Sequence, residues 1–84
     1  MEVTISTPER LAFSGAADSV VVHADKGQLT ILPQHANLIT FVEEGPLKVT
    51  SGGAQTDFEV SGGVLKVENE KISVLCQRVV RNDN

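Results

Sequence analysis

The chain has 84 residues and a formal net charge of −4, and it contains no Trp and no Tyr. This length predicts one domain, residues 1–84, with a small core built mainly from Val, Leu and Ile. The negative charge argues against nucleic acid as a partner, because phosphates select basic surfaces. The missing Trp and Tyr remove the aromatic platform on which sugars and bases usually stack.

The single cysteine, Cys76, leaves no pair for an internal disulfide and argues against a cysteine-based zinc site. Folding is therefore not expected to depend on an oxidising compartment. No apolar segment follows a basic start, so no signal peptide is visible. The longest apolar run, residues 38–42, falls far short of the roughly 18–20 residues of a membrane span. We expect a protein that is soluble, or peripheral to a membrane at most.

Short segments in which apolar and polar side chains alternate follow one another along the whole chain. A period of two places one side of each segment in the core and the other in water, which is the pattern of a β-strand. In chain order, the predicted strands are residues 2–6, 11–14, 19–23, 28–32, 38–42, 47–50, 58–61, 65–68 and 71–74.

The segments between these strands are rich in turn-forming residues, which supply positive φ angles or fixed bends. The polar residues 78–84 are predicted to fray as a tail. Eight to ten short, mainly antiparallel strands with no helical pattern indicate an all-β fold, a flattened sandwich or barrel, and the sandwich is favoured. The predicted turns and loops are residues 7–10, 25–27, 33–37, 43–46, 52–53, 62–63 and 69–71.

The sequence offers no arrangement typical of catalysis. His23 and His35 lie twelve residues apart on different elements and are interpreted as surface or hydrogen-bonded residues rather than metal ligands. No G-x-S-x-G elbow is present, and neither Gly-Gly pair is followed by the Lys-Ser/Thr of a phosphate loop. Cys76 is in phase with the apolar residues of the last alternating segment and is predicted to lie in the core. We expect no enzyme activity, no cofactor, no metal and no small-molecule ligand.

Three segments, taken in order, resemble a known family. They are T-P-E-R-L-A-F-S-G from Thr7, D-S-V-V-V-H-A-D-K-G-Q-L-T-I-L-P-Q-H-A-N-L-I-T from Asp18, and F-E-V-S-G-G-V-L-K-V-E-N-E-K-I-S-V-L from Phe58. Their order and spacing across almost the whole chain resemble the epsilon subunit of the F-type ATP synthase, which is called delta in mitochondria. The resemblance implies a non-catalytic rotor subunit that links the gamma subunit to the c-ring.

In this family the sandwich contacts gamma with one side and the loops of the c-ring with its lower end. The resemblance therefore implies a protein that is peripheral to the membrane through its complex, on the cytoplasmic face of the inner membrane if the source is bacterial. The residues that it assigns to the interface with gamma and the c-ring are Asp25, Lys26, Gly27, Gln28, Pro33, His35, Ala36, Glu43 and Glu44.

The chain departs from the family pattern at several positions. His23-Ala24 stands where Pro-Gly is common, Gln28 replaces a common acidic residue, and Asn37 replaces a common Pro. Many relatives continue with a two-helix hairpin that can block rotation, and the expectation is that this chain, ending at Asn84, lacks that hairpin. The alternative interpretation is a free-standing β-sandwich that binds a small ligand or a peptide, which would need an apolar groove.

Overall fold

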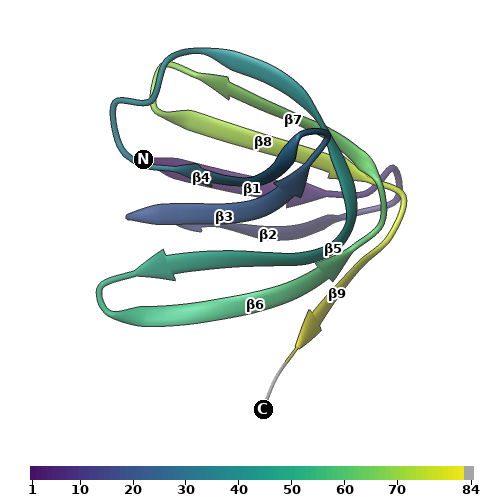
Figure 1. The fold of residues 1–84 in the computed structure, drawn as a ribbon. Coiled ribbons are helices and arrows are strands. Elements are labelled where there is room, and N and C mark those ends of the chain that lie inside the picture. The colour runs from purple at the N-terminus through teal and green to yellow at the C-terminus, as the bar shows by residue number, and fades with distance from the viewer. Residues whose placement is uncertain (83–84) are drawn as a thin grey trace.

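The computed structural model describes residues 1–82, and every regular element within them is a β-strand (Figure 1). The predicted all-β class is confirmed, and nine strands agree with the expected eight to ten. The strands are β1 Glu2–Ser6, β2 Leu11–Ala16, β3 Ser19–Ala24, β4 Gly27–Ile31, β5 Leu38–Ser51, β6 Ala54–Val60, β7 Gly63–Glu68, β8 Lys71–Cys76 and β9 Val79–Asn82.

The strands form one continuous curled sheet that folds over into two layers. Its main path runs β2-β1-β8-β7-β5-β3-β4, with β6 paired to β5 and β9 paired to β6. All pairings are antiparallel except that of β1 with β8, so the mainly antiparallel arrangement is confirmed. One layer holds the first part of β5 with β7, β8, β1 and β2, and the other holds β4, β3, the second part of β5, β6 and β9.

Strand β5 joins the two layers, and the turn predicted at residues 43–46 is wrong. Residues 38–42 pair with β7, whereas residues 45–51 pair with β6. Val42 lies opposite Ala24 of β3 and Leu47 lies opposite Val22, so residues 43–46 bulge past His23 without a chain reversal. Gly45 has a φ of +151°, which L side chains rarely adopt, and it allows the strand to bend here.

The core lies between the two layers and is built from the inward-facing residues of every strand. Phe58 is its largest fully buried side chain, and its ring meets the half-buried ring of Phe13 edge to face at a centroid distance of 5.3 Å. Cys76 belongs to this core, as its phase predicted. The inward period of two seen in the sequence thus accounts for the packing.

The C-terminal segment is more ordered than predicted. Residues 79–82 form β9, which pairs with β6 from Asp57 to Val60, and Val79 is buried in the core. The guanidinium of Arg10 donates a hydrogen bond from Nη2 to the Val79 carbonyl at 3.3 Å. The predicted fraying is therefore wrong for residues 79–82 and for Arg78, whose amide donates to Ser61 Oγ at 3.0 Å, and residues 83–84 lie outside the described residues.

Candidate functional site

The β3–β4 turn presents the first group of predicted interface residues. Asp25 and Lys26 form the two-residue connection, and Gly27 follows with a φ of +113° that suits glycine. All of these residues and Gln28 are exposed. The turn thus lies at one end of the two-layered sheet, which we call the β3–β4 end.

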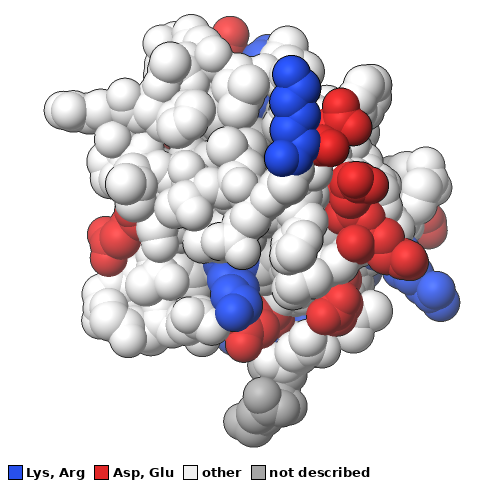
Figure 2. Space-filling model, in the orientation of Figure 1, with Lys and Arg blue, Asp and Glu red and all other residues white. Residues whose placement is uncertain are grey.

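Glu43 and Glu44 lie in the adjacent bend of β5, beside His23, because Val42 pairs with Ala24 and Leu47 pairs with Val22. Both side chains are exposed, and within residues 1–82 neither has a hydrogen bond or an ion pair. Acidic side chains gather along the right edge in Figure 2, the edge at which the β3–β4 turn and the β5 bend lie in Figure 1. Asp25 and Glu43 thus lie one residue away from the Ala24–Val42 pair, on opposite sides of it, whereas Glu44 lines a separate hollow with Arg78 and Val80.

Pro33, His35 and Ala36 lie at the opposite end of the sheet, in the loop between β4 and β5. This loop is tied to the β7–β8 turn, where the Asn69 amide donates to Asn37 Oδ1 at 3.2 Å and the Gln34 amide donates to the Glu70 carboxylate. Strand β4 separates this loop from Asp25 and Lys26. The structure therefore does not bring all the predicted interface residues to one surface.

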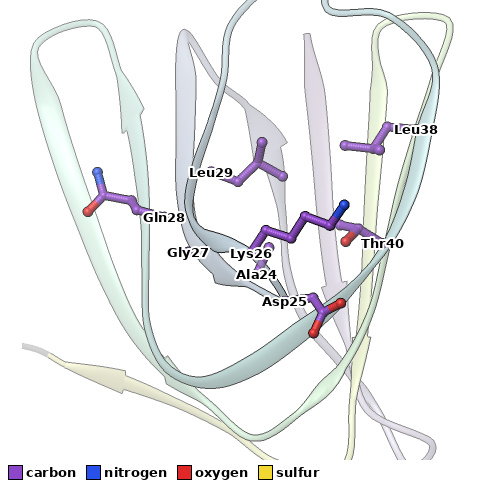
Figure 3. A pocket seen from close by; sticks show the side chains of 8 residues that line it. All are labelled: Ala24, Asp25, Lys26, Gly27, Gln28, Leu29, Leu38 and Thr40. Carbon is purple, nitrogen blue, oxygen red and sulfur yellow. The ribbon is translucent and has the colours of Figure 1, made fainter.

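A small pocket opens between the edge strand β4 and the first part of β5. It has a volume of about 230 Å³ and is lined by residues 24–29 together with Leu38 and Thr40. Figure 3 shows Leu29 and Leu38 pointing into this space, while Lys26 extends across its mouth toward Thr40. The pocket therefore has an apolar floor and a cationic side chain over its opening.

The layer formed by the first part of β5 with β7, β8, β1 and β2 carries on its outer face an apolar surface that the sequence did not predict. Phe41 of β5 lies opposite Val64 of β7, and Val64 lies opposite Leu75 of β8. Ser6 of β1 continues the row from Leu75 to Leu11 of β2. The apolar members of this row are 39–70% exposed, and Ile39, next along the same face of β5, is also 70% exposed.

We call Leu11, Ile39, Phe41, Val64 and Leu75 the apolar stripe. Adjacent strands lie about 4.8 Å apart, so the stripe crosses five strands over roughly 19 Å. Isolated exposed apolar residues are ordinary, whereas Ile39, Phe41, Val64 and Leu75 are neighbours and form a candidate interaction surface, which Ser6 separates from Leu11. The sequence signal was an exposed apolar residue in each of four strands, β2, β5, β7 and β8, and only the register shows how these residues line up.

Titratable groups do not converge on a site in the part of the chain that the structure describes. No group of three or more His, Cys, Asp or Glu side chains within residues 1–82 is placed to hold a metal ion. Burial raises the pKa of the Cys76 thiol above its ordinary value. No helix among the described residues is long and apolar enough to cross a membrane.

Comparisons with known proteins agree with the fold and the motifs. The family model for the β-sandwich domain of the ATP synthase Delta/Epsilon chain matches residues 1–82. ATP synthase epsilon chains of Desulforamulus reducens and Hydrogenovibrio crunogenus are 43% and 34% identical over 94% and 100% of this chain, respectively. This chain covers 60% and 58% of those two proteins, so it spans about three fifths of the length of its curated relatives.

Solved structures share the fold at lower sequence identity. A chain of the Euglena gracilis mitochondrial ATP synthase OSCP/F1/c-ring structure has a TM-score of 0.87 and 17% identity over 94% of this chain and 51% of that one. A chain of the Tetrahymena thermophila mitochondrial ATP synthase central stalk and c-ring has a TM-score of 0.80 and 19% identity, over 94% and 64%. With the family model matched along 82 of its 84 residues, the chain belongs to the family of ATP synthase delta/epsilon chain β-sandwich domains.

Proposed function

We propose that this domain is a non-catalytic rotor element of an F-type ATP synthase, joining the gamma subunit to the c-ring and so coupling ring rotation to ATP synthesis. Relatives named ATP synthase epsilon chain support the assignment to this complex. The apolar stripe and the β3–β4 end are two distinct surfaces, which supports a role in connecting two partners. For a bacterial source, the domain is peripheral to the cytoplasmic face of the inner membrane through its complex.

The apolar stripe is the observation that carries the proposal, and gamma is its proposed partner. Phe41 is 70% exposed at one end of the row, and aromatic residues, Phe included, are enriched at protein interfaces relative to the rest of the surface. A permanent interface needs a partner that removes this surface from water, since leaving it exposed favours aggregation. A shaft subunit that stays bound through each rotation fits that requirement.

The β3–β4 end is the proposed contact with the c-ring. Asp25 and Lys26 lie on the turn there, and Glu43 and Glu44 are exposed on the adjacent bend of β5, where Glu44 lines a hollow with Arg78. Complementary charge steers docking and fixes register more than it adds affinity, so basic residues in the ring loops are the expected counterparts. The loop of Pro33, His35 and Ala36 lies at the other end, and we leave it out of the ring contact.

Replacing Phe41 at one end of the stripe, or Leu75 within it, tests the gamma contact. Phe41→Gln and Leu75→Gln should each weaken binding of the purified domain to the gamma subunit roughly 10- to 100-fold, because each removes an apolar side chain from the buried surface. Calorimetric titration measures the affinity. Leu32→Gln, at a 55% exposed position outside the stripe, is the matched control and should bind as the unmodified chain does.

Unchanged gamma affinity in both stripe variants, with native stability, would overturn the assignment of this surface. If the unmodified domain bound neither gamma nor the ring, the free-standing module inferred as the alternative from the sequence would take the place of the rotor role.

A further inference from the structure

The pocket between β4 and β5 lies where the two layers of the sheet have open edges. Strand β4 ends the sheet path in one layer, and the first part of β5 borders the other layer, where it pairs with β7 alone until Val42. The gap between these edges gives access to the interior. The volume of about 230 Å³ is below the roughly 300–1,000 Å³ of pockets that hold drug-sized ligands, so it suits a single side chain.

The chemistry of the pocket selects an apolar occupant. Leu29 and Leu38 are half-buried, pack against the core and point into the opening from opposite strands (Figure 3). The polar groups of Asp25 and Gln28 point away from this space in the same view. Only Lys26 crosses the mouth, and its aliphatic stem covers apolar surface while its ammonium stays in water.

The charges around the mouth favour a particular kind of residue next to the inserted side chain in the partner segment. Asp25 and Lys26 are the two charged residues that line the pocket. Within the described residues Asp25 has no ion pair, so its carboxylate is available to a charged group of a partner. A partner segment that inserts here is therefore favoured if a basic residue flanks its apolar one.

We propose that this pocket is a socket for one aliphatic side chain from a c-ring loop, with an adjacent Lys or Arg of that loop facing Asp25. The inference rests on the proposed ring contact and specifies the partner chemistry at that surface. The socket fixes the position of the ring loop, because an inserted side chain resists sideways displacement that an ion pair between exposed groups tolerates. Docking displaces the Lys26 stem from the mouth.

The test is binding of the 84-residue chain to the assembled c-ring in detergent. Thr40→Phe fills the socket from its rim and should weaken ring binding at least about 10-fold. This factor is the lower end of the range expected when one buried aliphatic side chain loses its contact. Thr30→Phe makes the same substitution on the outer face of β4, where Thr30 is exposed, and should bind the ring normally. Both variants should keep the affinity for gamma, which also reports that they are folded.

A second variant identifies the occupant and does not depend on filling the pocket. Leu29→Ala removes one wall, and each apolar residue of the ring loops is replaced by Ala in turn in a double-mutant cycle. At one loop position, the loss of affinity in the double variant should differ by at least about 5-fold from the product of the two single losses. Additive effects at every apolar position would overturn the socket.

The remaining outcomes separate the socket from the ring contact itself. Normal ring binding by Thr40→Phe overturns the socket alone. Failure of the unmodified chain to bind the ring, while it still binds gamma, overturns the proposed ring contact and the socket with it. Loss of vesicle binding in Thr40→Phe with unchanged ring binding would assign the pocket to a lipid chain and overturn the proposal.

Discussion

Gly63 is the residue at which β7 approaches β8 too closely for any side chain. A Cβ built there would lie 2.1 Å from the Leu75 carbonyl oxygen and 3.0 Å from the Cys76 Cα, which are backbone atoms of the paired strand. Gly63→Ala is therefore expected to lower the free energy of unfolding by about 3 kcal/mol or more, because β8 must move away. Urea unfolding followed by circular dichroism measures the change.

The neighbouring Gly62 provides the control for this prediction. Its nearest contact for an added Cβ is the Val42 carbonyl oxygen at 3.4 Å, which is close to ordinary van der Waals separation. Gly62→Ala should change stability by less than about 1 kcal/mol in either direction. If the two substitutions lowered stability equally, the close approach of β7 and β8 would not be the reason that residue 63 must be glycine.

Cys76 makes the stability of the domain sensitive to alkaline pH. Burial raises its thiol pKa in the folded state, whereas the unfolded chain releases the proton near the ordinary value of 9.0. Below that value both states hold the proton and the full stability is present. As pH rises past it, only the unfolded state loses its proton, so the free energy of unfolding falls.

Thermal unfolding of the unmodified chain and of Cys76→Ala between about pH 7 and pH 10 isolates this effect, since Lys titrations are common to both. The unfolding temperature of the unmodified chain should fall more steeply above about pH 9. Parallel curves for the two proteins would assign the alkaline loss to other groups.

At the scale of elements, β9 is expected to contribute measurably to stability although it lies at the edge of the sheet. Val79 is 5% exposed and belongs to the core, whereas Val80 on the same strand is 52% exposed. Val79→Ala should cost about 2 kcal/mol for two lost methyl groups and the cavity they leave. Val80→Ala should cost less than about 0.5 kcal/mol. Chemical denaturation of both variants decides, and a negligible cost at residue 79 would contradict the packing of β9.

The strands that were predicted are specified by a local alternation of apolar and polar residues, whereas those that were missed are specified by pairing with distant strands. Phe58 and Val60, or Ile72 and Val74, alternate with polar residues, so local pattern alone predicted β6, at least in part, and β8. The β9 segment has one inward valine followed by an exposed valine and polar residues, so it lacks a longer alternation, and its pairing with β6 is a contact between distant residues. The same limit applies to β5, where Glu-Glu-Gly-Pro is typical of a turn and only the change of partner strands shows a bend.

The apolar stripe and the socket could not be predicted for a related reason. Phe41 lies in a run of apolar residues whose phase is ambiguous, and its neighbour Val64 is known only from the strand register. Asp25 and Glu43 were predicted as interface residues from the family resemblance, and in the structure they follow Ala24 and Val42, which pair with each other. The separation of His35 from them depends on the length of β4, which motif matching does not consider.

At the scale of the whole molecule, ring binding should depend on charge and salt, whereas gamma binding should not. Glu43→Lys combined with Glu44→Lys should slow docking to the ring at low salt and leave gamma binding unchanged, because the charges lie off the apolar stripe. Raising the ionic strength from about 0.01 M to 1 M shortens the screening length from roughly 30 Å to 3 Å and should weaken ring binding of the unmodified chain.

Surface-plasmon measurements of association rates provide this comparison, with Glu2→Lys combined with Glu68→Lys as a control of equal charge change on exposed residues away from the β3–β4 end. Equal ring association by both double variants would show that only net charge matters. An equally strong salt effect on gamma binding would contradict the apolar character assigned to that contact.

The bend in β5 has a mechanical consequence in the proposed rotor role. Phe41 of the apolar stripe and Glu43 of the bend, the proposed contacts with gamma and the ring, are separated by a single residue of the same strand. An extended strand is already near its contour limit of about 3.3 Å per residue and lengthens little under tension. In the proposed assembly, a pull applied at the ring therefore reaches the shaft along covalent backbone, without loading the packed interior between the layers, and elastic compliance is expected elsewhere in the rotor.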